Sequence, residues 1–271
     1  MNLSKENPAI REDCPWPEAK PPVAPDTVVS RRHGIFAPSR NFDASCPELL
    51  DRPDTALSLV HEELSMLEKM NRNLGGHRLQ LQYVERLLES LSGEFQVLDL
   101  GTGAADIPRA VVAWAKQRGT RAQVTAVDGN PAVLAYARAA CRDWPEIQFV
   151  QCDLRVLPFA PRRFDLVMCS LALHHFSSRD AVAILRRMSE LTRVGFIVND
   201  LRRNWPAIWM SELMARTFRR DSLARVDGPQ SCRAAFTVTE LNAMALEAGL
   251  QNFQIHRHHA GFRMVLEGWV G

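Results

Sequence analysis

Three aspartates come at the ends of short apolar stretches that the residue pattern predicts as strands: Asp99, Asp128 and Asp153. Because parallel strands end at the same edge of a sheet, these carboxylates are expected to converge on one site. After the first of them, Gly101 and Gly103 predict a tight turn that leads into a helix. A strand, a glycine turn and a helix N-terminus together form a ready site for a nucleotide-like ligand.

The position of Asp99 indicates what kind of ligand this site would take. A carboxylate just before the first glycine would repel a pyrophosphate and would attract an ammonium or a sulfonium. Asp128 stands where a carboxylate can accept hydrogen bonds from both hydroxyls of a ribose. Asp153 and Leu154 can hold an adenine, the acid by its amino group and the leucine by its face. The three acids therefore suit the ammonium, the ribose and the adenine of one ligand.

The elements that must position these residues alternate between strand and helix from Phe95 onward. Short apolar strands separated by helices predict an α/β fold, with a parallel sheet that helices cover on both faces. Two closing strands are expected after the last helix. The predicted strands are 95–100, 123–128, 147–151, 164–170, 194–199, 251–258 and 261–268, and the helices between them are about 107–116, 131–142, 180–191 and 239–248.

Other parts of the chain flank or interrupt this pattern. Residues 1–47 hold half of the 16 prolines and are predicted to form an extended or disordered arm. Residues 48–92 predict a cap of two helices, and residues 93–271 form the main domain. Within that domain, an insertion over 201–237 carries apolar residues at helical spacing, namely Trp205, Ile208, Trp209, Leu213 and Phe218.

Composition excludes several other classes of protein. A formal net charge of +2 gives no strong attraction to nucleic acid. The six cysteines form no CxxC pair, and no apolar run approaches the length of a membrane span, which together predict a cytoplasmic protein with reduced thiols. No metal site is expected, because strand alternation would divide the histidines of 256–259 between two faces. A band of arginines over 186–225 leaves a peripheral contact with an anionic membrane open, and monomer and homodimer both stay open.

Four segments resemble the class I S-adenosylmethionine-dependent methyltransferases in order and spacing: VLDLGTGAAD (97–106), VTAVDGNP (124–131), QCDLRVLPF (151–159) and FDLVMCSLALHHF (164–176). One departure is Ala105, where that family often has a third glycine. The resemblance implies a Rossmann-like, seven-stranded, mostly parallel sheet with an N-terminal helical cap and a helical insertion after strand five. It also implies S-adenosylmethionine as the cofactor, bound by Asp99, Gly101, Thr102, Gly103, Asp106, Asp128, Gly129, Asn130, Asp153, Leu154, Cys169 and Leu171.

Segments that flank these four motifs resemble particular groups within the methyltransferase family. The segments 71–77, 199–203 and 227–237 are similar to bacterial methyltransferases encoded beside type III polyketide synthases, and more distantly to quinone-biosynthesis methyltransferases. The similarity implies an enzyme that methylates a phenolic hydroxyl of a polyketide-derived or quinone-like small molecule. Carbon methylation of a similar ring stays open, as does a non-catalytic, cofactor-binding partner subunit. Asp99 and Asp106 argue against a nicotinamide-dependent reductase.

Candidate residues for the acceptor chemistry are those expected to lie beside the methyl group of the cofactor. His174 and His175 come just after strand four, and a histidine can accept the proton of a phenol near neutral pH. A structural role for the pair, shaping the loop or capping the next helix, stays open. The insertion is expected to form the acceptor pocket, with its substrate-binding residues being Trp205, Trp209, Arg202 and Arg233.

Overall fold

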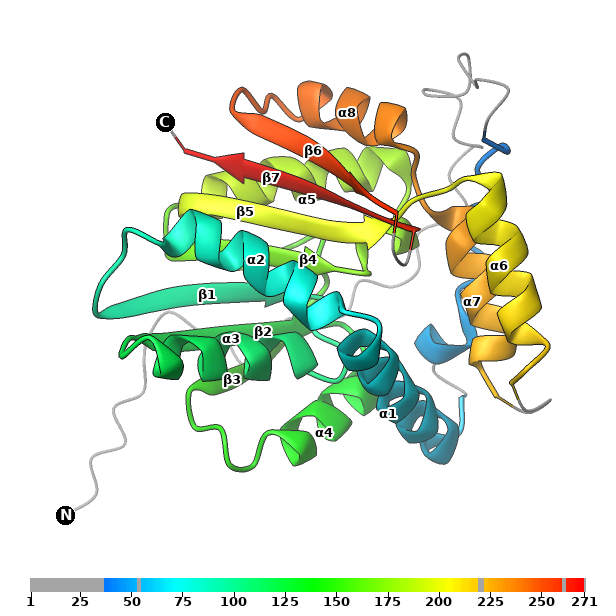
Figure 1. Cartoon of the computed structure of the whole chain (residues 1–271), viewed down its shortest axis with the longest axis horizontal. Helices are drawn as coiled ribbons and strands as arrows, with labels where there is room; N and C mark the ends of the chain where they lie inside the picture. Colours follow the sequence, from blue (N-terminus) through cyan, green and yellow to red (C-terminus); the bar gives the residue numbers. More distant parts are fainter. Residues whose placement is uncertain (1–36, 53–54, 219–221, 260–261, 271) are drawn as a thin grey trace.

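The computed structural model describes residues 37–52, 55–218, 222–259 and 262–270. Seven strands form one sheet in the order β3-β2-β1-β4-β5-β7-β6 (Figure 1). Strand β7 runs antiparallel to both of its neighbours, and the pairs from β3 to β5 are parallel, which confirms the predicted sheet. The strands are β1 (Glu94–Leu100), β2 (Arg121–Asp128), β3 (Ile147–Gln151), β4 (Phe164–Ser170), β5 (Thr192–Leu201), β6 (Phe253–His258) and β7 (Arg263–Trp269).

Helices cover both faces of this sheet (Figure 1). Helices α2, α3 and α4 contribute to one buried apolar cluster, and α5 and α8 contribute to the other. Two short 3₁₀ helices, η1 (Leu49–Asp51) and η2 (Leu173–His175), lie near the carboxyl ends of the strands. The α-helices are α1 (Leu57–Asn73), α2 (Gly76–Leu88), α3 (Asp106–Gln117), α4 (Pro131–Ala140), α5 (Ser178–Leu191), α6 (Trp205–Ala215), α7 (Ala224–Ala234) and α8 (Val238–Glu247).

Strand β1 shows why the apolar runs form a sheet that is buried on both faces. Phe95 and Val97 join the cluster beneath α2 and α3, whereas Leu98 and Leu100 join the cluster beneath α5 and α8. This division follows because successive side chains of a strand point to opposite faces. Central strands of this kind have little polar surface except at their ends, which is where the site residues lie.

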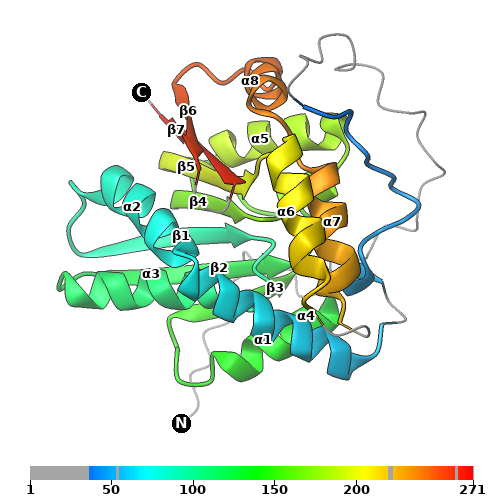
Figure 2. The same ribbon diagram turned by 45° about the vertical axis from the view of Figure 1, so that its right-hand side comes forward.

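The predicted helical cap is confirmed as α1 and α2. Gly75, with φ +81°, stands between them in the left-handed region that favours glycine. Helix α2 packs on the sheet beside α3, and α1 extends past the sheet to contact α4 (Figure 2). No helix in the described ranges is both long and apolar enough to cross a membrane.

The insertion after β5 folds as two helices, α6 and α7, which lie side by side across the carboxyl ends of the strands (Figure 2). Helix α7 was not predicted as a separate element. The apolar residues at helical spacing in 205–218 differ in burial. Ile208 is buried, but the side chains of Trp205, Trp209 and Leu213 are exposed to solvent.

Residues 37–52, here called the strap, run across the same edge of the molecule. The buried guanidinium of Arg203 holds the strap by donating from Nε to the carbonyl of Pro38 at 2.9 Å. The same guanidinium donates from Nη2 to Glu240 Oε1 of α8 at 2.6 Å. Arg40 donates to the carbonyls of His174 and Phe176 at 3.0 and 2.8 Å. The predicted arm of 1–47 therefore includes a bound portion from 37 onward, and its first 36 residues lie outside the described ranges.

Candidate active site

Strand register brings two of the three predicted acids together. Asp99 lies opposite Ala126, one strand over from Asp128 at the end of β2, so both carboxylates lie at the same edge of the sheet. Asp153 follows β3 directly and lies beside Asp128, whose carbonyl accepts from the Cys152 backbone N–H at 3.1 Å. The expected convergence of strand ends is therefore confirmed by the sheet.

The glycine turn passes close to its neighbours and leaves open space on one side. Gly101 has φ +69°, and a Cβ added there would approach the Ala172 Cβ to 2.5 Å. Gly103 has φ +53° and nothing within 4 Å of its would-be Cβ, so this part of the turn offers bare backbone to a ligand. The Gly103 N–H donates to Asp128 Oδ2 at 3.1 Å, which ties the turn to the neighbouring strand end.

The conformation and burial of Ala105 explain how an alanine can stand where the glycine pattern has a third glycine. Its φ of +54° places it in the left-handed region, where glycine carries no steric cost and alanine does. Its methyl group is fully buried in the cluster beneath α2 and α3. The position therefore has the backbone conformation that glycine favours, and alanine compensates by packing.

Two carboxylates at this edge have raised pKa values. Asp99 is 2% exposed, and burial raises its pKa to about 7, with the carboxylates of Asp106 and Asp128 acting in the same direction. Burial also raises the pKa of Asp128 to about 6, although its carboxylate accepts from the backbone of Gly103 and Asn130. A ligand that brings positive charge and hydroxyl groups would relieve this repulsion, so the residues fit S-adenosylmethionine.

Asp153 and Leu154 differ in how free they are to meet an adenine. The Asp153 carboxylate is buried and accepts from the Arg155 guanidinium at 2.6–3.0 Å and from the Arg155 N–H at 2.9 Å. Leu154 reaches to 3.9 Å from the position that a Gly101 Cβ would take, so it lies against the turn. The adenine role of the acid stays a prediction, and Arg155 competes for it.

Asp106, predicted to bind the cofactor, is held by the helical cap. Its Oδ2 accepts from Asn71 Nδ2 at 2.8 Å and lies 2.6 Å from His77 Nε2. Arg263 in turn donates to Asn71 Oδ1 at 3.0 Å. These contacts give a structural reason for the Asn71–His77 segment, which joins the α1–α2 junction to the glycine turn.

The end of β4 places its residues beside the turn through backbone rather than side chains. The Cys169 side chain is fully buried, and burial raises the pKa of its thiol well above the ordinary range. Leu171 adopts φ +54°, and its N–H donates to the Asn199 carbonyl at 2.8 Å. This bend brings Ala172 against Gly101 and starts the short helix η2. Gly129, with Asn130, follows Asp128 at the end of β2.

His174 is buried and is held by Asp200, which follows Asn199 on β5. The His174 Nδ1 lies 2.6 Å from Asp200 Oδ1, and the His174 N–H donates to Asp200 Oδ2 at 3.0 Å. Burial raises the pKa of Asp200, but the pairing with His174 outweighs burial and holds that pKa below its ordinary value. Since an ionised carboxylate only accepts, Nδ1 is the donor and Nε2 faces the site.

His175 faces two acids of the strap. Its Nδ1 lies 2.8 Å from Asp51 Oδ2, and its Nε2 lies 3.9 Å from Glu48 Oε2. Burial lowers the pKa of His175, but these carboxylates outweigh it and raise the pKa to about 10. The imidazole is therefore protonated at neutral pH in this arrangement. His175 as the base stays a prediction that requires this arrangement to change.

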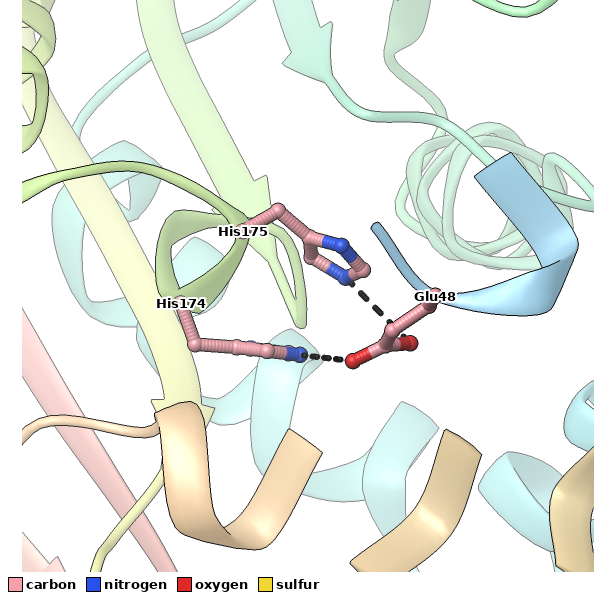
Figure 3. A group of neighbouring side chains, drawn as sticks. All are labelled: Glu48, His174 and His175. Atoms are coloured by element: carbon pink, nitrogen blue, oxygen red, sulfur yellow. Dashed lines mark ion pairs between the residues drawn. The ribbon is translucent and has the colours of Figure 1, made fainter. Parts of the chain in front are cut away.

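Sequence reasoning missed three acids around the histidines: Glu48, Asp51 and Asp200. Figure 3 shows Glu48 facing both imidazoles, with His174 Nε2 3.8 Å from Glu48 Oε1. Glu48 and Asp51 lie far from η2 in the sequence and gave no signal. Asp200 had one, because it follows the end of the predicted strand 194–199, as the other acids follow theirs.

Three of the four predicted acceptor residues line one groove. Trp205, Trp209 and Arg233 border a cavity of about 560 Å³ between α6 and residues 37–41 of the strap. Arg233 pairs there with Glu212. Arg202 is not among the lining residues, and its buried Nε has no hydrogen-bond partner in the described part of the chain.

Two histidines near the C-terminus lie on one face of β6, as alternate residues of a strand do. His256 and His258 both contact the Tyr83 ring, so they share one face of β6. His256 Nε2 lies 2.8 Å from Glu267 Oε1, and His258 Nε2 lies 2.8 Å from the Tyr83 hydroxyl. These contacts give both rings a role in joining α2 to the sheet.

Comparisons with known proteins agree with this geometry. A family model described as a methyltransferase domain matches residues 97–195. The chain is 29% identical over 195 residues to the ubiquinone/menaquinone biosynthesis C-methyltransferase UbiE of Xylella fastidiosa (strain M23), covering 66% of this chain and 74% of that protein.

Solved structures share the fold at low sequence identity. One is a SAM-dependent methyltransferase from Aquifex aeolicus, with a TM-score of 0.55 and 14% identity over 78% of this chain and 98% of that one. Another is magnesium protoporphyrin IX methyltransferase from Synechocystis PCC 6803 with bound SAH, with a TM-score of 0.50 and 16% identity over 72% and 84%. The matched residues run from within β1 to within β5 and include Asp99, Asp128 and Asp153. Residues 97–195 therefore match a methyltransferase domain in a fold that S-adenosylmethionine-dependent methyltransferases share, and these findings support a class I methyltransferase with S-adenosylmethionine as the cofactor.

Proposed function

We propose that the protein transfers a methyl group from S-adenosylmethionine to a phenolic hydroxyl of a polyketide-derived or quinone-like small molecule. The observation that carries this proposal is the His174–Asp200 pair, which lies beside the glycine turn through η2 and Ala172. A pair of this kind can promote loss of a proton from an acceptor, which simple binding of the cofactor would not require.

Residues at the strand ends divide the work of holding the cofactor. Asp128 retains lone pairs for the ribose hydroxyls besides those that accept from Gly103 and Asn130. Asp99, when ionised, attracts the positive charge of the methionine portion. The bound cofactor supplies a methyl group on a sulfonium, which is already activated, so the protein's task is to align the acceptor and exclude water.

The proton of the acceptor is the remaining chemical problem. A phenol has a pKa near ~10, so a group beside it must help remove the proton at neutral pH. Asp200 orients the His174 ring so that Nε2 faces the site. His175 carries a proton in this arrangement, so His174 is the better-placed of the two predicted bases.

Carbon methylation is the second candidate. It is favoured by one observation, that the curated relative from Xylella fastidiosa is named a C-methyltransferase. An activated ring carbon also loses a proton after methyl transfer, so the same residues would serve. The atom that receives the methyl group distinguishes the two candidates.

A screen with simple phenols and quinols tests the proposal. Purified protein is incubated with methyl-labelled S-adenosylmethionine and each acceptor, and the product is analysed by mass spectrometry and NMR. A labelled methoxy group is the expected product. Label on a ring carbon would favour the second candidate. Bound cofactor without any labelled product would favour a non-catalytic, cofactor-binding partner subunit.

His175→Ala tests the histidine pair. We expect turnover to fall at least tenfold, since the imidazole of His175 is removed from the acceptor side of the site. Cofactor affinity measured by calorimetry should stay within about twofold. His61→Ala is the matched control, because His61 is an exposed residue of α1 that contacts Tyr136. Unchanged turnover in His175→Ala would remove this histidine from the mechanism.

A further inference from the structure

The two histidines of η2 and one acid of the strap place three metal-ligating groups together. The ligand atoms of Glu48, His174 and His175 all lie within 4.8 Å of one another (Figure 3). Both imidazoles present Nε2 to the same carboxylate, at 3.8 and 3.9 Å. These separations exceed hydrogen-bond length, so the three groups face one another without bonding directly.

The outer nitrogen of each ring is held by a further carboxylate. His174 Nδ1 lies 2.6 Å from Asp200 Oδ1, and His175 Nδ1 lies 2.8 Å from Asp51 Oδ2. Metal-bound histidines characteristically donate their second ring N–H to a carboxylate, which fixes the tautomer and aims the other nitrogen at the ion. Here that arrangement occurs on both rings, from two different parts of the chain.

The third ligand is positioned in the same way. Glu48 Oε1 accepts from the Ser231 hydroxyl at 2.6 Å, and the Glu48 side chain is buried. The two imidazole rings lie 4.3 Å apart between centroids, on adjacent residues. Metal–nitrogen and metal–oxygen bonds of about 2.0–2.2 Å would require the ligands to close in by about 1 Å, which side-chain rotation can supply.

We propose that Glu48, His174 and His175 bind one first-row divalent transition-metal ion, through the two Nε2 atoms and the carboxylate. Two imidazoles with one carboxylate suit zinc or iron(II), whereas magnesium and calcium prefer oxygen ligands alone. Three protein ligands leave coordination positions open. The proposal concerns binding, and it stands whether or not the acceptor is a phenol.

The role of the ion rests on the proposed function. An acceptor hydroxyl bound at an open position loses its proton to solvent more readily, because the cation stabilises the oxygen anion. That oxygen then forms its bond to the methyl carbon as the carbon–sulfur bond breaks, and the sulfonium becomes a neutral thioether. In this arrangement the histidines act as ligands and neither needs to accept the proton.

Zinc binding tests the site directly. Untagged protein is freed of metal with a chelator and titrated with Zn²⁺ by calorimetry, and its melting temperature is followed with and without Zn²⁺. We expect one ion per chain and a rise in melting temperature. Glu48→Gln and His174→Asn should each weaken binding more than 100-fold, and Asp51→Asn about 10–100-fold. His61→Asn, on an exposed residue away from the cluster, should bind as the parent does.

Two results would overturn the site: absence of Zn²⁺ binding in the parent, or equal binding in the parent, Glu48→Gln and His174→Asn. The Zn²⁺-free melting temperature of each variant shows whether it is folded. The visible spectrum of the Co²⁺-substituted protein should change when a phenol is added. If chelated enzyme methylates phenols at the full rate, the role of the ion is wrong and the proposed function stands. If Zn²⁺ binds but no acceptor is methylated, the site stands and the proposed function fails.

Discussion

Asp99 lies almost entirely out of water, and a carboxyl group with a pKa of about 7 changes its charge in the physiological range. A cationic cofactor binds the ionised form better, so its affinity should increase as pH rises. Between pH 6 and 7.5 the ionised fraction increases about eightfold, and we expect a roughly tenfold decrease in the dissociation constant. Calorimetry across this range measures it. Asp99→Asn should bind more weakly and lose most of the dependence, leaving the part that Asp128, with its pKa of about 6, contributes, and a parent affinity independent of pH would contradict the assignment.

Asp128 supports the cofactor through direct hydrogen bonds. Asp128→Ala removes charged hydrogen bonds of about 1.5–3 kcal/mol, so we expect cofactor binding to weaken by one to two orders of magnitude. The dissociation constant by calorimetry is the measurement. Asp143→Ala, on an exposed residue after α4, is the control and should leave the constant unchanged. If both variants bind equally well, the ribose assignment is wrong.

How far the sequence predicts a site residue depends on where its partners come from. Asp99 and Asp128 were predictable, because each ends a strand and a parallel sheet gathers strand ends. Glu48 and Asp51 were not, since their relation to His175 arises only when the strap crosses the sheet edge. Asp200 lies between these cases: it ends β5, but its partner η2 shows no helical periodicity.

At the scale of elements, the junction between α1 and α2 is fixed to the glycine turn through Asp106. His77→Ala removes one hydrogen bond to that partly buried carboxylate. We expect the free energy of unfolding to fall by about 1–3 kcal/mol, as for other hydrogen bonds to charged groups. Denaturant unfolding gives the value. His61→Ala should change it by less than about 0.5 kcal/mol, and an equal loss in both variants would contradict the role of the junction.

Strands and most helices were predicted within a few residues, because their apolar patterns are strong. Thr237 caps α8 and forms a capping box with Glu240. Helix α7 could not be predicted in the same way, since Gly228 and Pro229 lie inside it and both disfavour a helix interior. Packing against α6 overrides that local preference. The exposed tryptophans of α6 show that apolar periodicity does not indicate which face of a helix is covered.

For the whole molecule, the groups whose pKa values are raised act on stability in one direction above pH 5, whereas the pKa of His258, which burial lowers, acts in the opposite direction. Burial raises the pKa of Glu63 and Asp99 to about 7, and of Asp128 and Asp227 to about 6, so the folded state binds more protons than the unfolded state between about pH 4 and 7. The pKa of His175, raised to about 10, adds stability below about pH 6.5 that is lost as pH rises through 10.

We therefore expect the melting temperature of the cofactor-free protein to fall steadily from pH 5 to pH 9. Thermal unfolding at constant ionic strength measures this. Glu63→Gln keeps an acceptor for the Ala224 N–H, which Glu63 Oε2 accepts at 2.9 Å, but it cannot ionise. The variant should show a smaller decline between pH 5 and 7. A melting temperature that rises over this range would mean that the acids are not buried as described.

The strap contacts both the predicted cofactor site and the histidine pair. The Leu50 carbonyl accepts from Asn130 Nδ2 at 3.1 Å beside the predicted adenine site, and Glu48 faces the histidines. Asp227 fixes the strap between them by accepting from the N–H groups of Leu49 and Leu50 at 2.9 and 3.0 Å. A displacement of residues 48–50 would therefore alter the predicted cofactor site and the histidine pair together. We therefore expect a substitution in residues 48–50 to change cofactor affinity and turnover at the same time.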